Sequence, residues 1–214
     1  MPIALNPVEQ RVLGALIEKE MATPEYYPMS LNALHNACNQ KNNREPVIQL
    51  VDLDVVAAVE VMRHNGLAFE HSGREHRVPK YSQGIGQKLN LGNKDLAVLS
   101  VLLCRGPQTP GELRGRTNSL YSFEDLDAVL STLARLAAKE DPLVKELPRA
   151  PGTKEARWTH LIGNSIPDFA AISETRLAPP LAATAATASR IEELEERIRA
   201  LEEFAERLKS QLGV

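Results

Sequence analysis

The sequence predicts a mainly α fold with small β-wings (α+β): two tandem winged helix-turn-helix domains plus a C-terminal coiled-coil helix. Residues 1–88 and 89–165 each contain three apolar patterns of helical spacing, followed by a basic, hairpin-like stretch. Residues 166–188 are rich in Ala, Thr and Pro and predict a linker. Residues 189–214 carry heptad spacing, which indicates the coiled-coil helix.

In the first domain, Asn6-Pro7 predicts a helix start, because proline at the first helical position loses no useful N–H. A second helix begins after Ser30, a favoured N-cap residue. The third helix is expected from about Asp52 to Asn65, ended by a glycine. Its inward residues are predicted from their spacing: Val55, Val56, Val59 and Met62. Short strands at 67–70 and 78–81 complete a hairpin.

The second domain repeats this plan in a shorter form. Helices are expected from Lys94 to Cys104, after Thr109-Pro110, and after the capping segment 122–125. Two extended segments, 143–147 and 156–161, predict the second hairpin. The first helices of the two domains align through Val12, Leu13, Leu16 and Ile17 with Val98, Leu99, Leu102 and Leu103. The third helices align through Val55, Val59 and Met62 with Leu126, Leu130 and Leu133, and Leu136 extends this second core face.

The C-terminal helix is expected to form the seam of a homodimer. Apolar residues recur in it at three- and four-residue intervals: Ile191, Leu194, Ile198, Leu201, Ala205, Leu208 and Leu212. The predicted dimer seam consists of Ile191, Leu194, Ile198, Leu201 and Leu208. Isoleucine at the a positions and leucine at d favour two parallel strands. The alternative is a single amphipathic helix that packs back on its own chain, since three heptads are near the minimum for an independent coiled coil.

Composition limits the classes of function. The chain has 25 Lys and Arg against 28 Asp and Glu, and the acidic excess lies in the C-terminal segment. It is therefore not a generally cationic nucleic-acid binder. No secretion signal or membrane-length apolar run occurs, so we expect a cytoplasmic protein that does not enter membranes. Cys38 and Cys104 are expected to be buried as small apolar residues.

DNA is one expected partner, because winged helices often place their third helix in the major groove. Both third helices here expose acidic residues, which repel phosphates. Contact is therefore predicted from loops and wings, through phosphates and without sequence readout. The predicted contact residues are Lys41, Asn42, Arg44, Arg74, Arg77 and Lys80. The alternative is that these side chains are ordinary solvated surface groups.

A protein partner is the other expected class. Tandem winged domains also serve as docking modules within larger complexes, and an acidic third helix fits that use better than base readout. An enzyme is not expected: the histidines are scattered and no phosphate-binding glycine loop follows a strand. We predict no catalytic residue, no metal ligand and no cofactor.

The loop after the second predicted helix carries a family resemblance. Residues 27–34 and 37–46, which include Asn39-Gln40-Lys41-Asn42-Asn43-Arg44, closely resemble the signature of the YceH-like family of uncharacterised bacterial proteins. Residues 11–20 match as well. The resemblance implies a tandem winged-helix fold in a cytoplasmic bacterial protein, and it implies no activity or cofactor. The amide-rich loop either satisfies its own backbone or contacts a partner.

Overall fold

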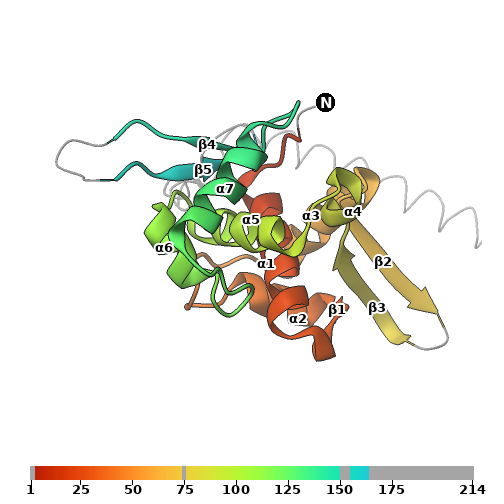
Figure 1. The fold of residues 1–214 in the computed structure, drawn as a ribbon. Coiled ribbons are helices and arrows are strands. Elements are labelled where there is room, and N and C mark those ends of the chain that lie inside the picture. Colours follow the sequence, from red (N-terminus) through yellow and green to blue (C-terminus); the bar gives the residue numbers. More distant parts are fainter. Residues whose placement is uncertain (1–2, 74–75, 150–154, 164–214) are drawn as a thin grey trace, which may run out of the picture. The chain divides into compact units, whose positions relative to one another are not determined.

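A computed structural model describes residues 3–73, 76–149 and 155–163, except for the side chains of His76 and Arg77. These residues form an α+β fold within one compact unit, residues 1–169. Seven α-helices, one short 3-10 helix and two small antiparallel sheets occur in the described part (Figure 1). No helix in these residues is both long and apolar enough to cross a membrane.

The first half contains four helices and a three-stranded sheet. Its elements are α1 (Pro7–Ala22), η1 (Pro24–Tyr26), β1 (Met29–Ser30), α2 (Leu31–Cys38), α3 (Asp52–His64), β2 (Ala68–Gly73), β3 (His76–Gln83) and α4 (Ile85–Leu89). The Asn6 side chain accepts from the backbone N–H groups of Val8 and Glu9, and Ser30 caps α2, as predicted. The sheet order is β1-β3-β2, with Ser30 opposite Lys80 and His71 opposite Lys80 on the other side. Strand β1 and helix α4 were not predicted, because each is very short.

The second half repeats the three helices and the hairpin. Its elements are α5 (Asn93–Arg105), α6 (Pro110–Arg116), α7 (Leu126–Ala137), β4 (Val144–Glu146) and β5 (Trp158–His160). The Thr109 hydroxyl accepts from the Glu112 N–H and so caps α6, as predicted. Strands β4 and β5 pair antiparallel, and Gln108 forms an isolated bridge to Trp158 beside them.

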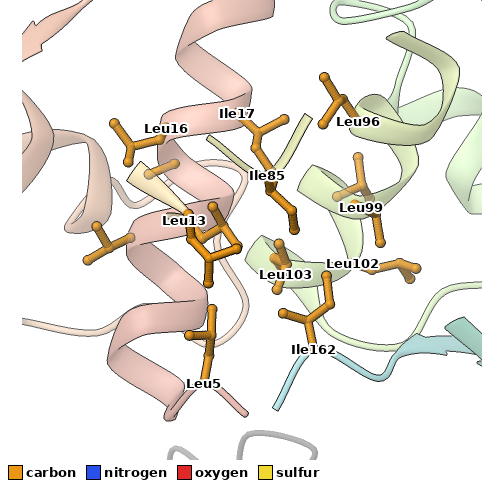
Figure 2. Close-up of a cluster of buried hydrophobic side chains, with 14 of the residues drawn as sticks. Leu5, Leu13, Leu16, Ile17, Ile85, Leu96, Leu99, Leu102, Leu103 and Ile162 are labelled. Atoms are coloured by element: carbon orange, nitrogen blue, oxygen red, sulfur yellow. The ribbon is translucent and has the colours of Figure 1, made fainter. Parts of the chain in front are cut away.

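The two halves share one core, centred on α1 and α5 (Figure 2). Every residue from Glu9 to Glu18 of α1 and from Asp95 to Cys104 of α5 is buried. A helix that is buried on all sides lies inside the structure, whereas a surface helix buries only one stripe. The side chains that meet here include those predicted to correspond: Leu13, Leu16 and Ile17 from α1, and Leu99, Leu102 and Leu103 from α5.

The close approach of α1 to α5 depends on Gly14. A Cβ atom at this position would lie 2.8 Å from the Cys104 Sγ and 2.9 Å from the Leu103 Cβ. The Ser100 hydroxyl also donates a hydrogen bond of 3.2 Å to the Gly14 carbonyl. The helices therefore touch along their backbones at this point.

The predicted core faces of the third helices need two corrections. In α7 the buried residues are Val129, Thr132, Leu133 and Leu136, which correspond to Val55, Ala58, Val59 and Met62 of α3. Leu126 and Leu130 are 39% and 38% exposed, so their assignment to the core was wrong and the alignment was displaced by one helical turn. Val56 is 36% exposed and was also wrongly placed inward. Both helices have apolar residues on adjacent stripes, and spacing alone does not show which stripe faces the core.

We predict that Gly14→Ala destabilises the protein. Alanine normally favours a helix over glycine by about 1 kcal/mol, but here its methyl group meets two buried side chains, and such overpacking costs about 1–3 kcal/mol. Urea unfolding should give a lower midpoint for this variant. Gly115→Ala is the matched control, since Gly115 lies in α6 and a Cβ there has nothing within 4 Å. The control should be slightly more stable than the wild type, and equal effects of both substitutions would contradict the close helix contact.

We predict a loss of stability at mildly acidic pH that depends on His160. This residue of β5 is 5% exposed, neither ring nitrogen has a partner among the described residues, and burial lowers its pKa to about 4. Below about pH 6.5, His160 therefore binds a proton in the unfolded chain but stays neutral in the folded protein. Folding stability falls as the pH drops from 6.5 towards 4. Between pH 7.5 and pH 5 the loss should be about 2 kcal/mol.

Urea unfolding of the wild type and His160→Gln at both pH values measures this effect. The remaining histidines are common to both proteins, so their contribution cancels in the comparison. His160→Gln should lose about 2 kcal/mol less than the wild type between the two pH values. Equal losses would show that His160 is not held neutral by burial.

Candidate functional site

The loop from Asn39 to Leu50 joins α2 to α3, and side-chain hydrogen bonds connect its two ends. The Asn39 Oδ1 accepts from the Leu50 N–H at 2.7 Å, and the Asn39 Nδ2 donates to the Leu50 carbonyl at 2.9 Å. The His35 Nε2 lies 2.8 Å from the same carbonyl oxygen. One asparagine thus pairs with the backbone of Leu50 much as a neighbouring strand would, and it fixes where α3 begins.

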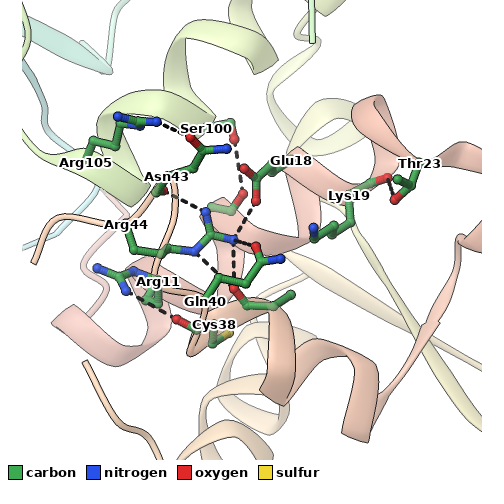
Figure 3. A network of polar contacts seen from close by, with 12 residues as sticks. Arg11, Glu18, Lys19, Thr23, Cys38, Gln40, Asn43, Arg44, Ser100 and Arg105 are labelled. Carbon is green, nitrogen blue, oxygen red and sulfur yellow. Dashed lines mark hydrogen bonds and ion pairs between the residues drawn. The ribbon is translucent and has the colours of Figure 1, made fainter. Parts of the chain in front are cut away.

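Arg44 holds the loop from inside (Figure 3). Its guanidinium has no exposed surface and lies 2.5 Å from a carboxylate oxygen of Glu18 on α1. It also donates to the Ala37 carbonyl at 2.8 and 3.1 Å, and to the Asn43 carbonyl and the Gln40 side chain at 2.8 and 3.2 Å. A buried guanidinium needs such a set of acceptors, because burying a charge without partners is costly.

The same loop contacts the second half of the chain. The Glu45 N–H donates to the Cys104 carbonyl at 2.9 Å, and Arg105 at the end of α5 donates to the Asn43 side-chain oxygen. Arg11 of α1 is fully buried and donates to the carbonyls of Cys38 and Pro46 at 3.3 and 2.8 Å. Three arginines therefore fix the loop against α1, α2 and α5.

The predicted contact residues do not all lie at the surface of the described structure. Lys41 and Asn42 are exposed on the loop, whereas Arg44 is buried and its guanidinium does not reach the surface. Lys80 is half-buried in the middle of β3, whose backbone also includes Arg77. Arg74 and the predicted dimer seam of Ile191, Leu194, Ile198, Leu201 and Leu208 lie outside the described residues. Of the amide side chains in the loop, Asn39, Gln40 and Asn43 bind within the chain, which accounts for much of the motif as structure.

Several apolar side chains on α3 and the preceding loop are exposed, a feature that sequence analysis missed. We call this set the α3 face. Its members are Val47 (50% exposed), Val51 (55%), Leu53 (77%), Val56 (36%) and Val61 (41%). Those on the helix alternate with the buried positions Val55, Ala58, Val59 and Met62. A set of exposed apolar side chains on one helix is a candidate interaction surface. The signal was present in the sequence, because α3 has more apolar residues than one buried stripe requires.

The charged side chains next to the α3 face are mainly acidic. Asp52 and Glu60 are 75% and 58% exposed. The nearby cation, Arg63, is neutralised by Glu60 at 2.7 Å and by Glu70 at 3.0 Å. An apolar face bordered by carboxylates suits neither the phosphates nor the base edges of DNA, which call for cations and amides.

Residues 5–153 match the family described as "Protein of unknown function, DUF480". The chain belongs to this family. Family membership was predicted from the loop motif, and the match confirms it; the matched region includes the loop, α3 and the hairpin of β2 and β3.

Three relatives resemble the chain over 76% to 99% of its length. The UPF0502 protein of Solibacter usitatus is 49% identical over 204 residues, which cover 94% of this chain and 96% of the relative. That of Aeromonas hydrophila is 45% identical over 216 residues, covering 99% and 94%. That of Koribacter versatilis is 53% identical over 162 residues, covering 76% and 75%. These names specify neither an activity nor a ligand.

We predict that Glu18→Gln strongly destabilises the fold. The substitution removes the carboxylate that faces the buried Arg44 guanidinium, and an uncompensated buried charge costs about 3 kcal/mol or more. Urea unfolding at pH 7.5 measures the change. Glu25→Gln, on the exposed η1 turn, is the matched control and should change stability by less than about 0.5 kcal/mol. A Glu18→Gln variant as stable as this control would show that the ion pair does not hold the loop.

Proposed function

We propose that this DUF480 protein is a tandem winged-helix binding protein whose first winged helix docks a protein partner through the α3 face. The order of the elements supports the winged-helix assignment. Helices α1, α2 and α3 are followed by the hairpin of β2 and β3, and helices α5, α6 and α7 by that of β4 and β5. Each set buries one stripe of its third helix.

The observation that carries the docking proposal is the exposure of the α3 face. In a winged helix that reads DNA, the exposed side of the third helix carries residues that bond to base edges. Here Leu53 and Val61 occupy that side, and Leu53 is 77% exposed. Covering these side chains with a partner's apolar surface removes them from water, which is the main favourable term in protein association.

The border of the α3 face indicates the charge of the partner. Asp52 and Glu60 favour a partner whose apolar residues are flanked by Lys or Arg, since complementary charges steer association and exclude wrong partners. A second copy of the same face would bring acidic borders together. We therefore infer a different protein with a basic, apolar segment.

Nucleic-acid binding through loop and wing phosphate contacts is the second candidate. The exposure of Lys41 and Asn42 favours it. It is the second candidate because the two nearby arginines are already paired with carboxylates. Arg44 pairs with Glu18, and Arg63 of α3 pairs with Glu60 and Glu70. The homodimer through residues 189–214 stays a prediction beside either candidate.

Two substitutions at Val61 test the docking proposal. We predict that Val61→Lys and Val61→Glu both weaken partner binding, because each removes an apolar contact, and that Val61→Lys weakens it more, because it repels a basic partner. The measurement is photo-crosslinking in cells of the source bacterium, with p-benzoylphenylalanine in place of Leu53. A discrete protein adduct should form at position 53. Its yield should be highest in the protein with Val61, lower in Val61→Glu and lowest in Val61→Lys.

The control places the same crosslinker at Ser131, an exposed residue of α7. This position should not give the adduct. No protein adduct at position 53, or one indifferent to both Val61 variants, would overturn the proposal. Micromolar, salt-sensitive binding of duplex DNA that Val61→Lys strengthens and Lys41→Gln weakens would favour the nucleic-acid candidate instead.

A further inference from the structure

A small hollow lies where the loop of the first half meets α5 and α6 of the second half. We call it the seam hollow. Its polar lining includes side chains from both halves: Asn43, Arg105, Arg116 and Ser119. Its volume is about 10 Å³, which is room for one water-sized group. Asn43 and Ser119 are exposed, so the seam hollow reaches the surface.

Two guanidinium groups line the seam hollow without full compensation. Arg105 donates to the neutral side-chain oxygen of Asn43 and makes no ion pair with another described residue. Burial, and then repulsion from the nearby Arg116, lower the pKa of Arg105. Two cations held close together in a partly buried place favour the arrival of an anion.

Of the carboxylates nearby, Glu18 and Glu112 are engaged in ion pairs, and Glu45 attracts Arg105 electrostatically. Glu18 also lines the seam hollow, but it lies 2.5 Å from the buried guanidinium of Arg44. Glu112 lies 3.7 Å from Arg116 and is shared with Arg157 at 3.2 Å. Arg116 also donates to the side-chain oxygen of Gln108, a neutral group. Four arginines around the hollow outnumber three carboxylates, so positive charge is in excess; the arginines are Arg44, Arg105, Arg116 and Arg157, and the carboxylates Glu18, Glu45 and Glu112.

We propose that the seam hollow binds a phosphate oxyanion. One oxygen enters between the guanidiniums of Arg105 and Arg116, where arginine donors provide the charged hydrogen bonds that phosphate prefers. The other phosphate oxygens remain at the exposed opening of the seam hollow, near Asn43 and Ser119. The phosphate belongs either to a small molecule or to a nucleic-acid backbone, and the site needs neither the α3 face nor its partner.

Phosphate bound here joins the two halves of the chain. Asn43 belongs to the loop before α3, whereas Arg105 and Arg116 belong to α5 and α6. A ligand that contacts both halves binds only when they are packed together. It therefore stabilises the folded unit by an amount that grows with the logarithm of its concentration above the dissociation constant.

The test is thermal unfolding of the full chain with increasing inorganic phosphate, against sodium chloride at the same ionic strength. We expect the unfolding midpoint to rise with the logarithm of the phosphate concentration above the dissociation constant, and not to rise with chloride. Arg105→Gln and Arg116→Gln should each weaken the apparent affinity at least tenfold. Arg114→Gln, on the exposed side of the same helix α6, is the matched control and should respond like the wild type.

Two further measurements keep the result unambiguous. Nuclear magnetic resonance should show a phosphate-dependent shift of the Asn43 side-chain amide in the wild type and a weaker response in both arginine variants, which separates loss of binding from a change in overall stability. A random duplex DNA that competes for the site in the wild type, but not in Arg105→Gln, identifies a backbone phosphate as the source; phosphate binding without competition identifies a small molecule. Equal effects of phosphate and chloride, or unchanged affinity in both arginine variants, would overturn the proposal.

Discussion

The structure depends on the direct contact between α1 and α5. Because Gly14 has no side chain, the two helices approach until the Ser100 hydroxyl reaches the carbonyl of Gly14. With this contact at the centre, the middle turns of both helices are buried on all sides and the cores of the two repeats merge into one. A repeated three-helix unit of this size buries little apolar surface by itself, so sharing the central pair gives each half a core that it would otherwise lack.

Burying α1 completely has a second consequence, because α1 carries charged residues. Arg11 is fully buried and the Glu18 side chain is only 11% exposed, so both need partners inside the protein. The end of α2 and the loop after it supply them: the Cys38 and Pro46 carbonyls accept from Arg11, and Arg44 pairs with Glu18. The polar residues of the loop motif therefore act mainly as internal structure. This frees α3 to present a different surface.

That surface distinguishes this protein from a winged helix that reads DNA. A base-reading helix exposes cations and amides, whereas α3 exposes valine and leucine between carboxylates. Cations occur instead at the seam between the halves, where Arg105 and Arg116 lie close together. The apolar face and the cationic seam therefore favour two separate ligands of different chemistry, a protein and a phosphate.

The sequence by itself determined the α+β class, most helix boundaries, the correspondence of α1 with α5 and the family, because caps, prolines and the loop motif are local signals. It misplaced Leu126, Leu130 and Val56, since adjacent apolar stripes on one helix share the same spacing. It also grouped Arg44 with exposed cations, although Lys41, three residues earlier, is at the surface. Only the tertiary structure decided these points. Burial depends on which segments pack together, and neither the meeting of α1 with α5 nor that of Arg44 with Glu18 follows from local sequence.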